Sequence, residues 1–202
     1  MIQEMIQFLK TRKKANLTMA AVNVIVFLVL CILGDTQSAA FMQAHGAAWT
    51  PAILNGEWYR LFTSMFLHFG IVHLLYNMLC LITLGDTLEH LTGPVRYLII
   101  YLGSGLCGNL LSLAWEMHTD EYAISAGASG AIFGVIGALF VIMLRLGIRN
   151  GRMNAKRLGI VAVLMIAQGF FEAGTDNIAH IGGLLGGMLL SFLLAGHSRL
   201  RS

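Results

Sequence analysis

Six apolar runs that contain no Asp, Glu, Lys or Arg constrain this chain more than any other feature. A helix needs ~20 mostly apolar residues to cross the hydrocarbon core of a bilayer. The runs leave no room for a soluble domain within 202 residues, so the sequence predicts an all-α polytopic membrane protein. The fifth run is short, at fourteen residues, and its helix must include polar flanking residues. The expected spans are 17–34, 61–85, 97–115, 122–144, 158–171 and 177–198.

The composition agrees with this fold class. Apolar residues make up 57% of the chain, charged residues 11%, and the mean hydropathy is +0.75. These values exclude an ordinary soluble domain. The net charge of +3 is explained by membrane topology, and nothing in it predicts nucleic-acid binding. Each cysteine lies inside an apolar run, where it acts as a small hydrophobic residue, so no disulfide or metal framework is expected from Cys31, Cys80 and Cys107.

Basic residues assign the two sides of the membrane. In a six-span arrangement the Lys and Arg clusters around residues 10–14, 145–157 and 199–201 fall on one side, which makes both termini cytoplasmic. The opposite side is acidic, and Arg60 is its only cation. Residues 116–121 on that side are expected to form a solvated loop, whereas Glu89, at the inner end of the second span, is expected to pair or cap.

The sequence predicts three parts of the chain, a terminal segment on each side of a central domain. Residues 1–16 are amphipathic at helical spacing, which predicts a short helix on the inner surface, although a disordered start fits almost as well. Residues 17–196 form the six-helix domain, and 197–202 form a cytoplasmic tail. The first span resembles a signal peptide in its basic flank, but eighteen uncharged residues are long for one, so we interpret it as retained.

The connection between the first two spans is long and aromatic, with Trp58 and Tyr59 directly before Arg60. Aromatic residues beside an arginine are typical of a membrane interface, and a plain aromatic belt is one interpretation. The other is a folded loop that lies partly in the bilayer. A loop of this length is rarely idle in a compact domain, which slightly favours a functional role.

Ser129 is flanked by glycines inside the fourth run. A serine in a membrane helix commonly bonds its own backbone, and Gly130, Gly134 and Gly137 share one helix face, so Ser129 is either a packing residue or a nucleophile. In the second span His73 and Asn77 share a face, while His68 falls in the preceding loop or at the helix start. These three side chains form either an interhelical hydrogen-bond cluster or part of a site. Zinc is a weaker interpretation, because no carboxylate lies at their depth.

The second, fourth and sixth spans all run from outside to inside and carry their polar residues near the outer end. Three segments therefore bring Ser129, His180 and the pair His73 and Asn77 to one depth. A fourth helix from Ser129 to Arg145 rises only ~24 Å, short of a ~30 Å hydrocarbon core. Its start would be submerged, which predicts a polar recess open to the outside.

That recess would hold the groups needed for acyl transfer to water. Ser129 is the candidate nucleophile and His180 the candidate base and acid. The Ser129 backbone N–H, His73 and Asn77 are candidate donors to an oxyanion. Asp176, four residues before His180, is better interpreted as a cap of the sixth helix than as a third catalytic member.

From residue 17 to 195 the chain resembles the rhomboid family of intramembrane serine proteases. The resemblance rests on four motifs in order: Glu57-Trp58-Tyr59-Arg60, the His68, His73 and Asn77 spacing, Gly127-Ala128-Ser129-Gly130, and Ala179-His180-Ile181-Gly182-Gly183. It implies a Ser129–His180 dyad without a carboxylate and an oxyanion site using His73 and Asn77. It also implies a hydrated cavity beneath a membrane-embedded first outer loop, transmembrane-helix substrates, a lateral gate between the second and fifth helices, and a bacterial inner membrane location.

One position departs from the commoner bacterial pattern, because Phe133 stands where a tyrosine often packs on the catalytic histidine. Phe133 can stack but offers no hydroxyl. Two other functions remain open: a catalytically silent relative that captures membrane helices, and a small transporter using the same recess. Neither a metal nor an organic cofactor is expected, and no glycine loop with a lysine indicates ATP or another nucleotide.

Overall fold

The computed structural model describes residues 13–147, 153–171 and 174–195. The described residues are helical and contain no β-strand, which confirms the all-α fold class. The expected surface helix at the N-terminus and the tail at 197–202 lie outside these ranges. The helices, with one 3₁₀ segment (η1) and one π segment (η2), are α2 Lys14–Leu33, α3 Ala39–Ala44, α4 Thr50–Leu54, α5 Arg60–Thr63, η1 Ser64–Phe66, α6 Gly70–Cys80, η2 Leu81–Gly85, α7 Asp86–Thr92, α8 Pro94–Thr119, α9 Ser129–Arg145, α10 Ala155–Gly169 and α11 Asn177–Ala195.

Four of these segments are long and apolar enough to cross a membrane: Lys14–Leu33, Gly70–Thr92, Pro94–Thr119 and Asn177–Leu194. The second is continuous through α6, η2 and α7. They expose large apolar side chains, which suits contact with lipid and would be unfavourable in water. The protein is therefore an integral membrane protein. Helix α9 is a shorter apolar helix and α10 has 15 residues, so the count of six spans remains a prediction.

Helix α9 begins at Ser129 and ends at Arg145, which is the shorter helix considered within the expected span 122–144; residues 122–128 are not helical. It contacts α8, α10 and α11 as well as the second span, and twelve of its 17 residues are buried. A helix that is apolar on all sides belongs inside a bundle, where other helices replace lipid around it. At ~1.5 Å per residue it is about 26 Å long, so it is too short to reach both surfaces of a ~30 Å hydrocarbon core.

Glycine brings the backbones of α9 and α11 into contact. A Cβ added at Gly183 would collide with the carbonyl oxygen of Gly130, and one at Gly187 would collide with that of Gly134. Small residues allow this close approach, which is how membrane helices gain packing energy when no water is expelled between them. The contact fixes how α11 lies against the start of α9.

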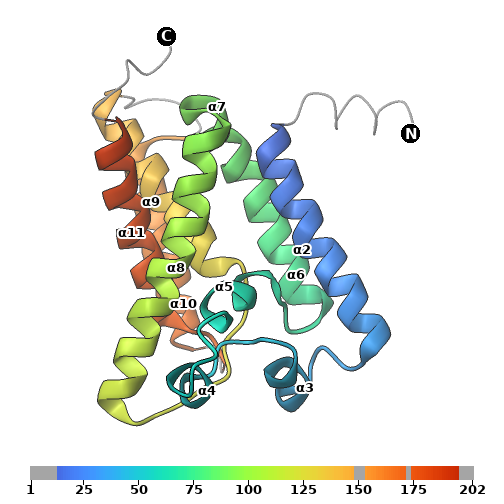
Figure 1. The fold of residues 1–202 in the computed structure, drawn as a ribbon. Helices are drawn as coiled ribbons and strands as arrows, with labels where there is room; N and C mark the ends of the chain where they lie inside the picture. Colours follow the sequence, from blue (N-terminus) through green and yellow to red (C-terminus); the bar gives the residue numbers. More distant parts are fainter. Residues whose placement is uncertain (1–12, 148–152, 172–173, 196–202) are drawn as a thin grey trace, which may run out of the picture.

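The connection between α2 and α6 is a folded loop, which we call the outer loop (residues 34–69). It contains α3, α4, α5 and η1 and packs at one end of the bundle (Figure 1). Arg60 is 7% exposed and donates to the carbonyl oxygens of Gln43 (2.6 Å) and Ala47 (2.9 Å) and to the carboxylate of Glu57 (2.8 Å). A buried guanidinium thus holds the loop together. The interpretation as a folded loop is confirmed, whereas its depth in a bilayer stays a prediction.

At the opposite end of the bundle, Glu89 caps α2. Its carboxylate accepts from the backbone N–H groups of Ala15 (3.3 Å) and Asn16 (2.7 Å), and the Asn16 side chain bonds Asp86 and Tyr97. The first N–H groups of a helix have no acceptor within the helix, so this carboxylate satisfies two of them. The expectation that Glu89 pairs or caps is confirmed.

The expectation of a solvated loop over 116–121 is wrong for Glu116. Helix α8 extends to Thr119, and Glu116 is only partly exposed within it. Its carboxylate accepts from Thr50 Oγ1 (2.6 Å) and from the backbone N–H of Ala123 (3.1 Å). An uncharged run cannot reveal that the next acidic residue is held by a distant loop, so the charge pattern ended this helix too early.

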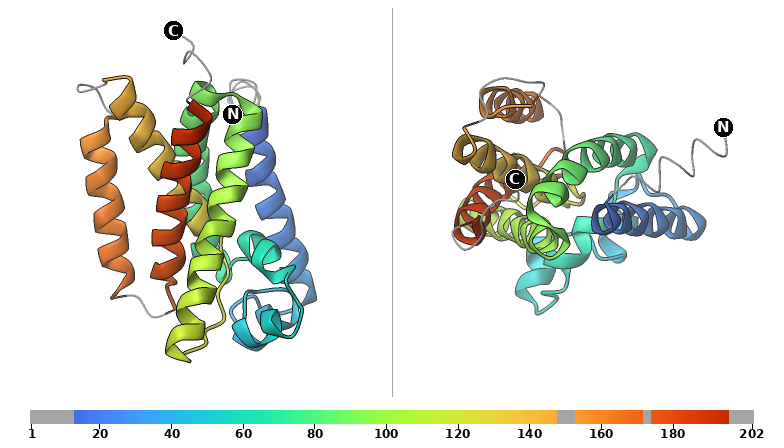
Figure 2. Two further views of the ribbon diagram at one scale, coloured as in Figure 1. Left: turned by 60° about the vertical axis from the view of Figure 1, so that its left-hand side comes forward. Right: turned by 90° about the horizontal axis from the view of Figure 1, so that it is seen from above.

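The chain arrangement agrees with the expected topology. Helix α2 begins and α11 ends at the same end of the bundle, while the outer loop lies at the other (Figures 1 and 2). An even number of crossings produces this arrangement. Which side of a membrane each end faces remains a prediction from the basic residues. Helix α10 stands at the edge of the bundle against α9, with few contacts to α11.

Candidate active site

Ser129 is the first residue of α9, at the end of a loop that the outer loop holds in place. Ala48 and Ser125 exchange two backbone hydrogen bonds (2.8 and 3.0 Å), and Gly127 donates its N–H to the carbonyl of Ser64 (2.9 Å). Gly127 has a φ of +143°, a conformation that residues with a Cβ rarely adopt. The loop therefore reaches Ser129 through a turn that requires glycine.

His180 lies in the first turn of α11, and its Nε2 is 2.8 Å from Ser129 Oγ. With the proton on Nδ1, Nε2 can accept the serine proton as the hydroxyl attacks. Within the described residues Nδ1 has no hydrogen-bond partner, so no carboxylate completes a triad. The two side chains have the geometry of a nucleophile and its general base.

Asp176 caps α11. Its Oδ1 accepts from the backbone N–H of Ala179 (2.8 Å), and its backbone carbonyl accepts from that of His180 (3.2 Å). The carboxylate therefore stabilises the turn that carries the histidine without touching the imidazole ring. The prediction of a cap is confirmed, as is its preference over a triad member.

Phe133 packs on the other side of the histidine. The two rings are stacked, with centroids 4.4 Å apart and planes inclined by 22°. Phe133 is one turn after Ser129 on α9, so the same helix presents the hydroxyl and the surface against which the imidazole rests. Stacking restricts rotation of the ring and keeps Nε2 directed at the hydroxyl.

His73 lies beside the nucleophile. A Cβ added at Gly127 would be 2.8 Å from His73 Cε1, 3.0 Å from its Nε2 and 3.6 Å from Ser129 Oγ. The imidazole and the hydroxyl therefore border one point, which only glycine leaves open. His68 is fully buried in the loop before α6; its ring meets His73 edge to face at 5.1 Å, and its Nε2 is 3.5 Å from the backbone N of Ala128.

Asn77 shares a helix face with His73, as expected, but its amide points along its own helix. Nδ2 donates to the carbonyl oxygen of His73 (2.9 Å). In this arrangement the amide is engaged by its own helix, so its expected role as an oxyanion donor stays a prediction. The first N–H groups of α9, which have no acceptor within the helix, are free to point at a developing oxyanion.

The remaining expected residues support the site indirectly. Gly130 packs against α11, and Arg60 braces the outer loop, whereas Trp58 is 56% exposed. Glu57 receives hydrogen bonds from Tyr59 and Arg60, which lower the pKa of its carboxyl group. The hydrogen bond that Tyr59 donates to Glu57 raises the pKa of the Tyr59 hydroxyl. These residues shape the rim of the outer loop and do not reach the reacting groups.

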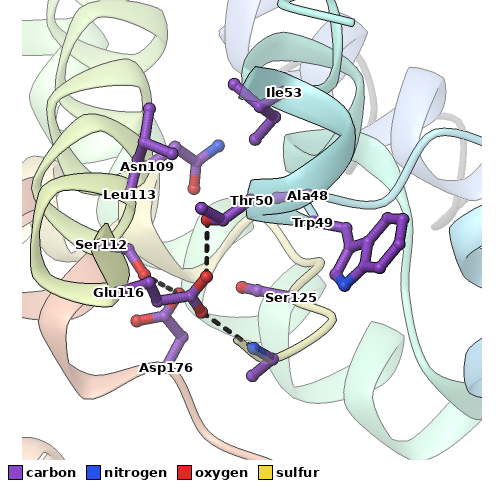
Figure 3. Close-up of a pocket in the computed structure, with 11 residues that line it drawn as sticks. Ala48, Trp49, Thr50, Ile53, Asn109, Ser112, Leu113, Glu116, Ser125 and Asp176 are labelled. Atoms are coloured by element: carbon purple, nitrogen blue, oxygen red, sulfur yellow. Dashed lines mark hydrogen bonds between the residues drawn. The ribbon is translucent and has the colours of Figure 1, made fainter. Parts of the chain in front are cut away.

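Several polar residues that the motifs do not single out also hold the site together. Asn109, on α8, donates to the carbonyl of Leu61 (2.6 Å) and to Ser64 Oγ (3.0 Å). One and two turns further along α8, Ser112 and Glu116 line a small recess with Thr50 and Asp176 (Figure 3). Their regular spacing on one helix face is the sequence signal that could have identified them.

The described residues contain no group of three or more His, Cys, Asp or Glu side chains placed to hold a metal ion. The chemistry available from the groups described here is proton transfer and nucleophilic attack by protein side chains.

Comparison with known proteins gives one consistent result. A sequence model of the family, described as the Rhomboid domain, matches residues 55–197. The chain is 36% identical over 178 residues to Rhomboid protease GluP of Bacillus subtilis, covering 86% of this chain and 33% of that protein. It is 42% identical over 171 residues to RHOMBOID-like protein 7 of Arabidopsis thaliana, covering 82% of this chain and 52% of that protein. It is 30% identical over 183 residues to Rhomboid-like protease 3 of Toxoplasma gondii, covering 88% of this chain and 68% of that protein.

The chain thus spans between a third and about half of the length of the first two relatives. The matched region runs from the outer loop through α11 and contains Ser129, His180, His73 and Asn77. The similarity therefore covers every group of the candidate site, and the chain belongs to the rhomboid family.

Proposed function

We propose that the protein is an intramembrane serine endopeptidase that cleaves transmembrane segments of other membrane proteins with a Ser129–His180 dyad. The observation that carries the proposal is the 2.8 Å contact between Ser129 Oγ and His180 Nε2 at the start of a helix too short to span the bilayer. Relatives that are named rhomboid proteases support the same reaction.

In the first step, Ser129 Oγ attacks a peptide carbonyl while His180 Nε2 takes the hydroxyl proton. The negative oxygen is stabilised by the Ser129 backbone N–H, by His73 beside Gly127, and by Asn77 once its amide turns from the His73 carbonyl. Removing one such donor typically lowers the rate by ~10²–10³. His180 then gives its proton to the leaving amine.

In the second step, water attacks the acyl-enzyme, with His180 again acting as base and then returning the proton to Ser129. The water enters from the outer side, where the submerged start of α9 requires a hydrated recess beneath the outer loop. Cleavage is therefore expected near the outer end of a substrate helix. The substrate must unwind there, since a helix hides its carbonyl groups in hydrogen bonds.

The proposed setting is the inner membrane of a bacterium, with six spans, both termini in the cytoplasm and the site open to the outside. Helix α10 stands at the edge of the bundle with few contacts to α11, and this arrangement supports entry of a substrate helix beside it.

The test is cleavage of a single-span substrate in liposomes, with the cut mapped by mass spectrometry. Wild type should cut near the outer end of the span, and Ser129→Ala and His180→Ala should each abolish cleavage. Ser125→Ala and His118→Ala are matched controls, since Ser125 bonds through its backbone and His118 is exposed on α8, and both should stay active. Cleavage that survives Ser129→Ala would exclude the mechanism.

A further inference from the structure

A hydrogen bond joins α8 to the first turn of the helix that carries the histidine. Ser112 is 8% exposed, and its Oγ donates to Asp176 Oδ2 (2.7 Å). The other carboxylate oxygen, Oδ1, accepts from the backbone N–H of Ala179 (2.8 Å). One side chain thus holds the start of α11 with one oxygen and α8 with the other (Figure 3).

This bond lies close to the reacting groups without touching them. The backbone N–H of His180 is bonded to the carbonyl of Asp176 (3.2 Å), and the imidazole lies one turn away from the carboxylate. A displacement of Asp176 therefore displaces the backbone of His180. Such a movement would lengthen the 2.8 Å contact between His180 Nε2 and Ser129 Oγ.

Elsewhere along the α8–α11 interface, glycines bring the two backbones into close contact. A Cβ at Gly108 would approach the carbonyl oxygen of Ala179 to 2.6 Å, and one at Gly182 would approach that of Cys107 to 3.0 Å. Such contacts bring two helices together but set their relative height only weakly, because dispersion forces have little directionality. Ser112 follows Gly108 by one turn on the same face. Because a hydrogen bond is directional, the bond from Ser112 to Asp176 fixes the height of α11 relative to α8.

The start of α11 needs this anchor because of what precedes it. Helix α10 packs mainly against α9, makes few contacts with α11 and leads into α11 through a short connection. It also exposes large apolar side chains along much of its length. The first turn of α11 therefore gains little support from α10, and a bond to the long helix α8 can supply it.

We propose that Ser112 and Asp176 are a positioning pair that fastens the first turn of α11 to α8 and keeps His180 in register with Ser129. The inference rests on the proposed function, and it adds two residues that act through His180 without contacting the substrate. Glu116, one turn beyond Ser112, ties the same helix to Thr50 and to Ala123, so α8 is itself held by the outer loop and by the loop that leads to Ser129.

The test compares kcat and KM for a single-span substrate between wild type and Ser112→Ala. A shift of about 1 Å in a reacting group can cost ~10²-fold in rate, so loss of this one link is expected to lower kcat about tenfold and leave KM unchanged. Ser104→Ala is the matched control, because Ser104 lies on the same helix and bonds only backbone carbonyls of its own helix. It should retain wild-type kcat.

Two further variants distinguish positioning from plain stability. Ser112→Thr keeps the hydroxyl and should restore most of kcat. Asp176→Ala removes both the cap and the link, and a fall of about a hundredfold is expected. Adding Ser112→Ala to Asp176→Ala should cause no further loss, since residues that act as one unit are not additive.

The outcomes separate the two proposals. If wild type cleaves and Ser112→Ala has the kcat of Ser104→Ala, the positioning pair is refuted and the protease stands. The positioning pair is also refuted if Ser112→Ala lowers the melting temperature without changing kcat, or if Ser112→Thr fails to restore kcat. A folded wild type that cleaves no substrate refutes the proposed function itself. Should Asp176→Ala fail to fold, the Ser112 variants decide alone.

Discussion

At the scale of single residues, the orientation of one imidazole decides whether this site can react. Nδ1 of His180 donates no hydrogen bond to the described residues, so the ring is held by the contact with Ser129 and by the stacked ring of Phe133. A triad would use a carboxylate for this purpose. Here the apolar face of Phe133 performs the orientation without a hydroxyl.

Replacing Phe133 should therefore impair catalysis more than folding. Phe133→Leu keeps an apolar side chain of similar size but removes the flat face, so we expect kcat to fall about tenfold as the imidazole samples other orientations. Phe133→Tyr keeps the stacking and should retain activity. The measurement is steady-state cleavage with the melting temperature recorded alongside, and equal kcat values for all three proteins would contradict the role of stacking.

Arg60 is the second residue whose removal has a definite expected result. Arg60→Ala leaves two buried carbonyl groups without their donor, which should lower the free energy of unfolding by about 2–4 kcal/mol. Arg60→Lys can keep one of these bonds, so its free energy of unfolding should lie between those of wild type and Arg60→Ala. Thermal unfolding in detergent measures the effect, and an unchanged melting temperature for Arg60→Ala would contradict the bracing role.

The bond from Arg60 to Glu57 adds a small dependence on pH. Hydrogen bonds from Tyr59 and Arg60 hold the pKa of Glu57 below its ordinary value, so its contribution is complete above the ordinary pKa and is lost as pH falls through the lowered one. Glu57 lies at the surface, where solvent weakens the pair. Wild type and Glu57→Gln should therefore differ slightly near neutral pH and converge in acid.

Residue positions were predictable from the sequence to different degrees. Ser129 and His180 stand out because polar side chains are rare in apolar spans, and three helices running in one direction must bring them to one depth. The amide direction of Asn77 depends on its rotamer, which spacing does not encode. The bonds of Glu116 to Thr50 and Ala123 join segments that no local pattern connects.

At the scale of elements, the glycine contacts between α9 and α11 set the distance between nucleophile and base. Each helix carries one of the two groups within its first turn, and their backbones touch at Gly130 and Gly183. The existence of the long helices follows from the uncharged runs, but their bounds do not, since α6 begins only at Gly70 and α8 extends to Thr119. The short helices α3, α4 and α5 could not be predicted in this way, because tertiary hydrogen bonds stabilise them.

Gly183→Ala should separate the two helices and disable the dyad. The new methyl group would collide with the Gly130 carbonyl, which overpacks a close contact and is expected to cost about 1–3 kcal/mol of stability and nearly all activity. Gly159→Ala is the matched control, since its methyl would make ordinary contact at 3.4 Å with Phe140. Full activity in Gly183→Ala would show that this contact does not set the dyad distance.

At the scale of the whole molecule, a short central helix packed against α8, α10, α11 and the second span suits the proposed hydrolysis in a membrane. In the proposed setting α9 begins below the outer surface, so other helices and water would replace lipid around its first N–H groups and Ser129. The outer loop covers that end of α9. Its backbone hydrogen bonds to the loop before Ser129 connect it to the candidate active site. Composition and helix lengths predict this architecture. The position of the outer loop over the site could be learned only from the structure.

The most direct test of the central claim is the reaction of Ser129 with a fluorophosphonate, followed by intact mass and peptide mapping. A serine activated by an adjacent base forms a stable phosphonyl ester, whereas an ordinary serine does not. We predict one adduct, on Ser129, in the wild type and none in a folded His180→Ala variant. An unlabelled folded wild type, or equal labelling of His180→Ala, would contradict the claim that His180 activates Ser129.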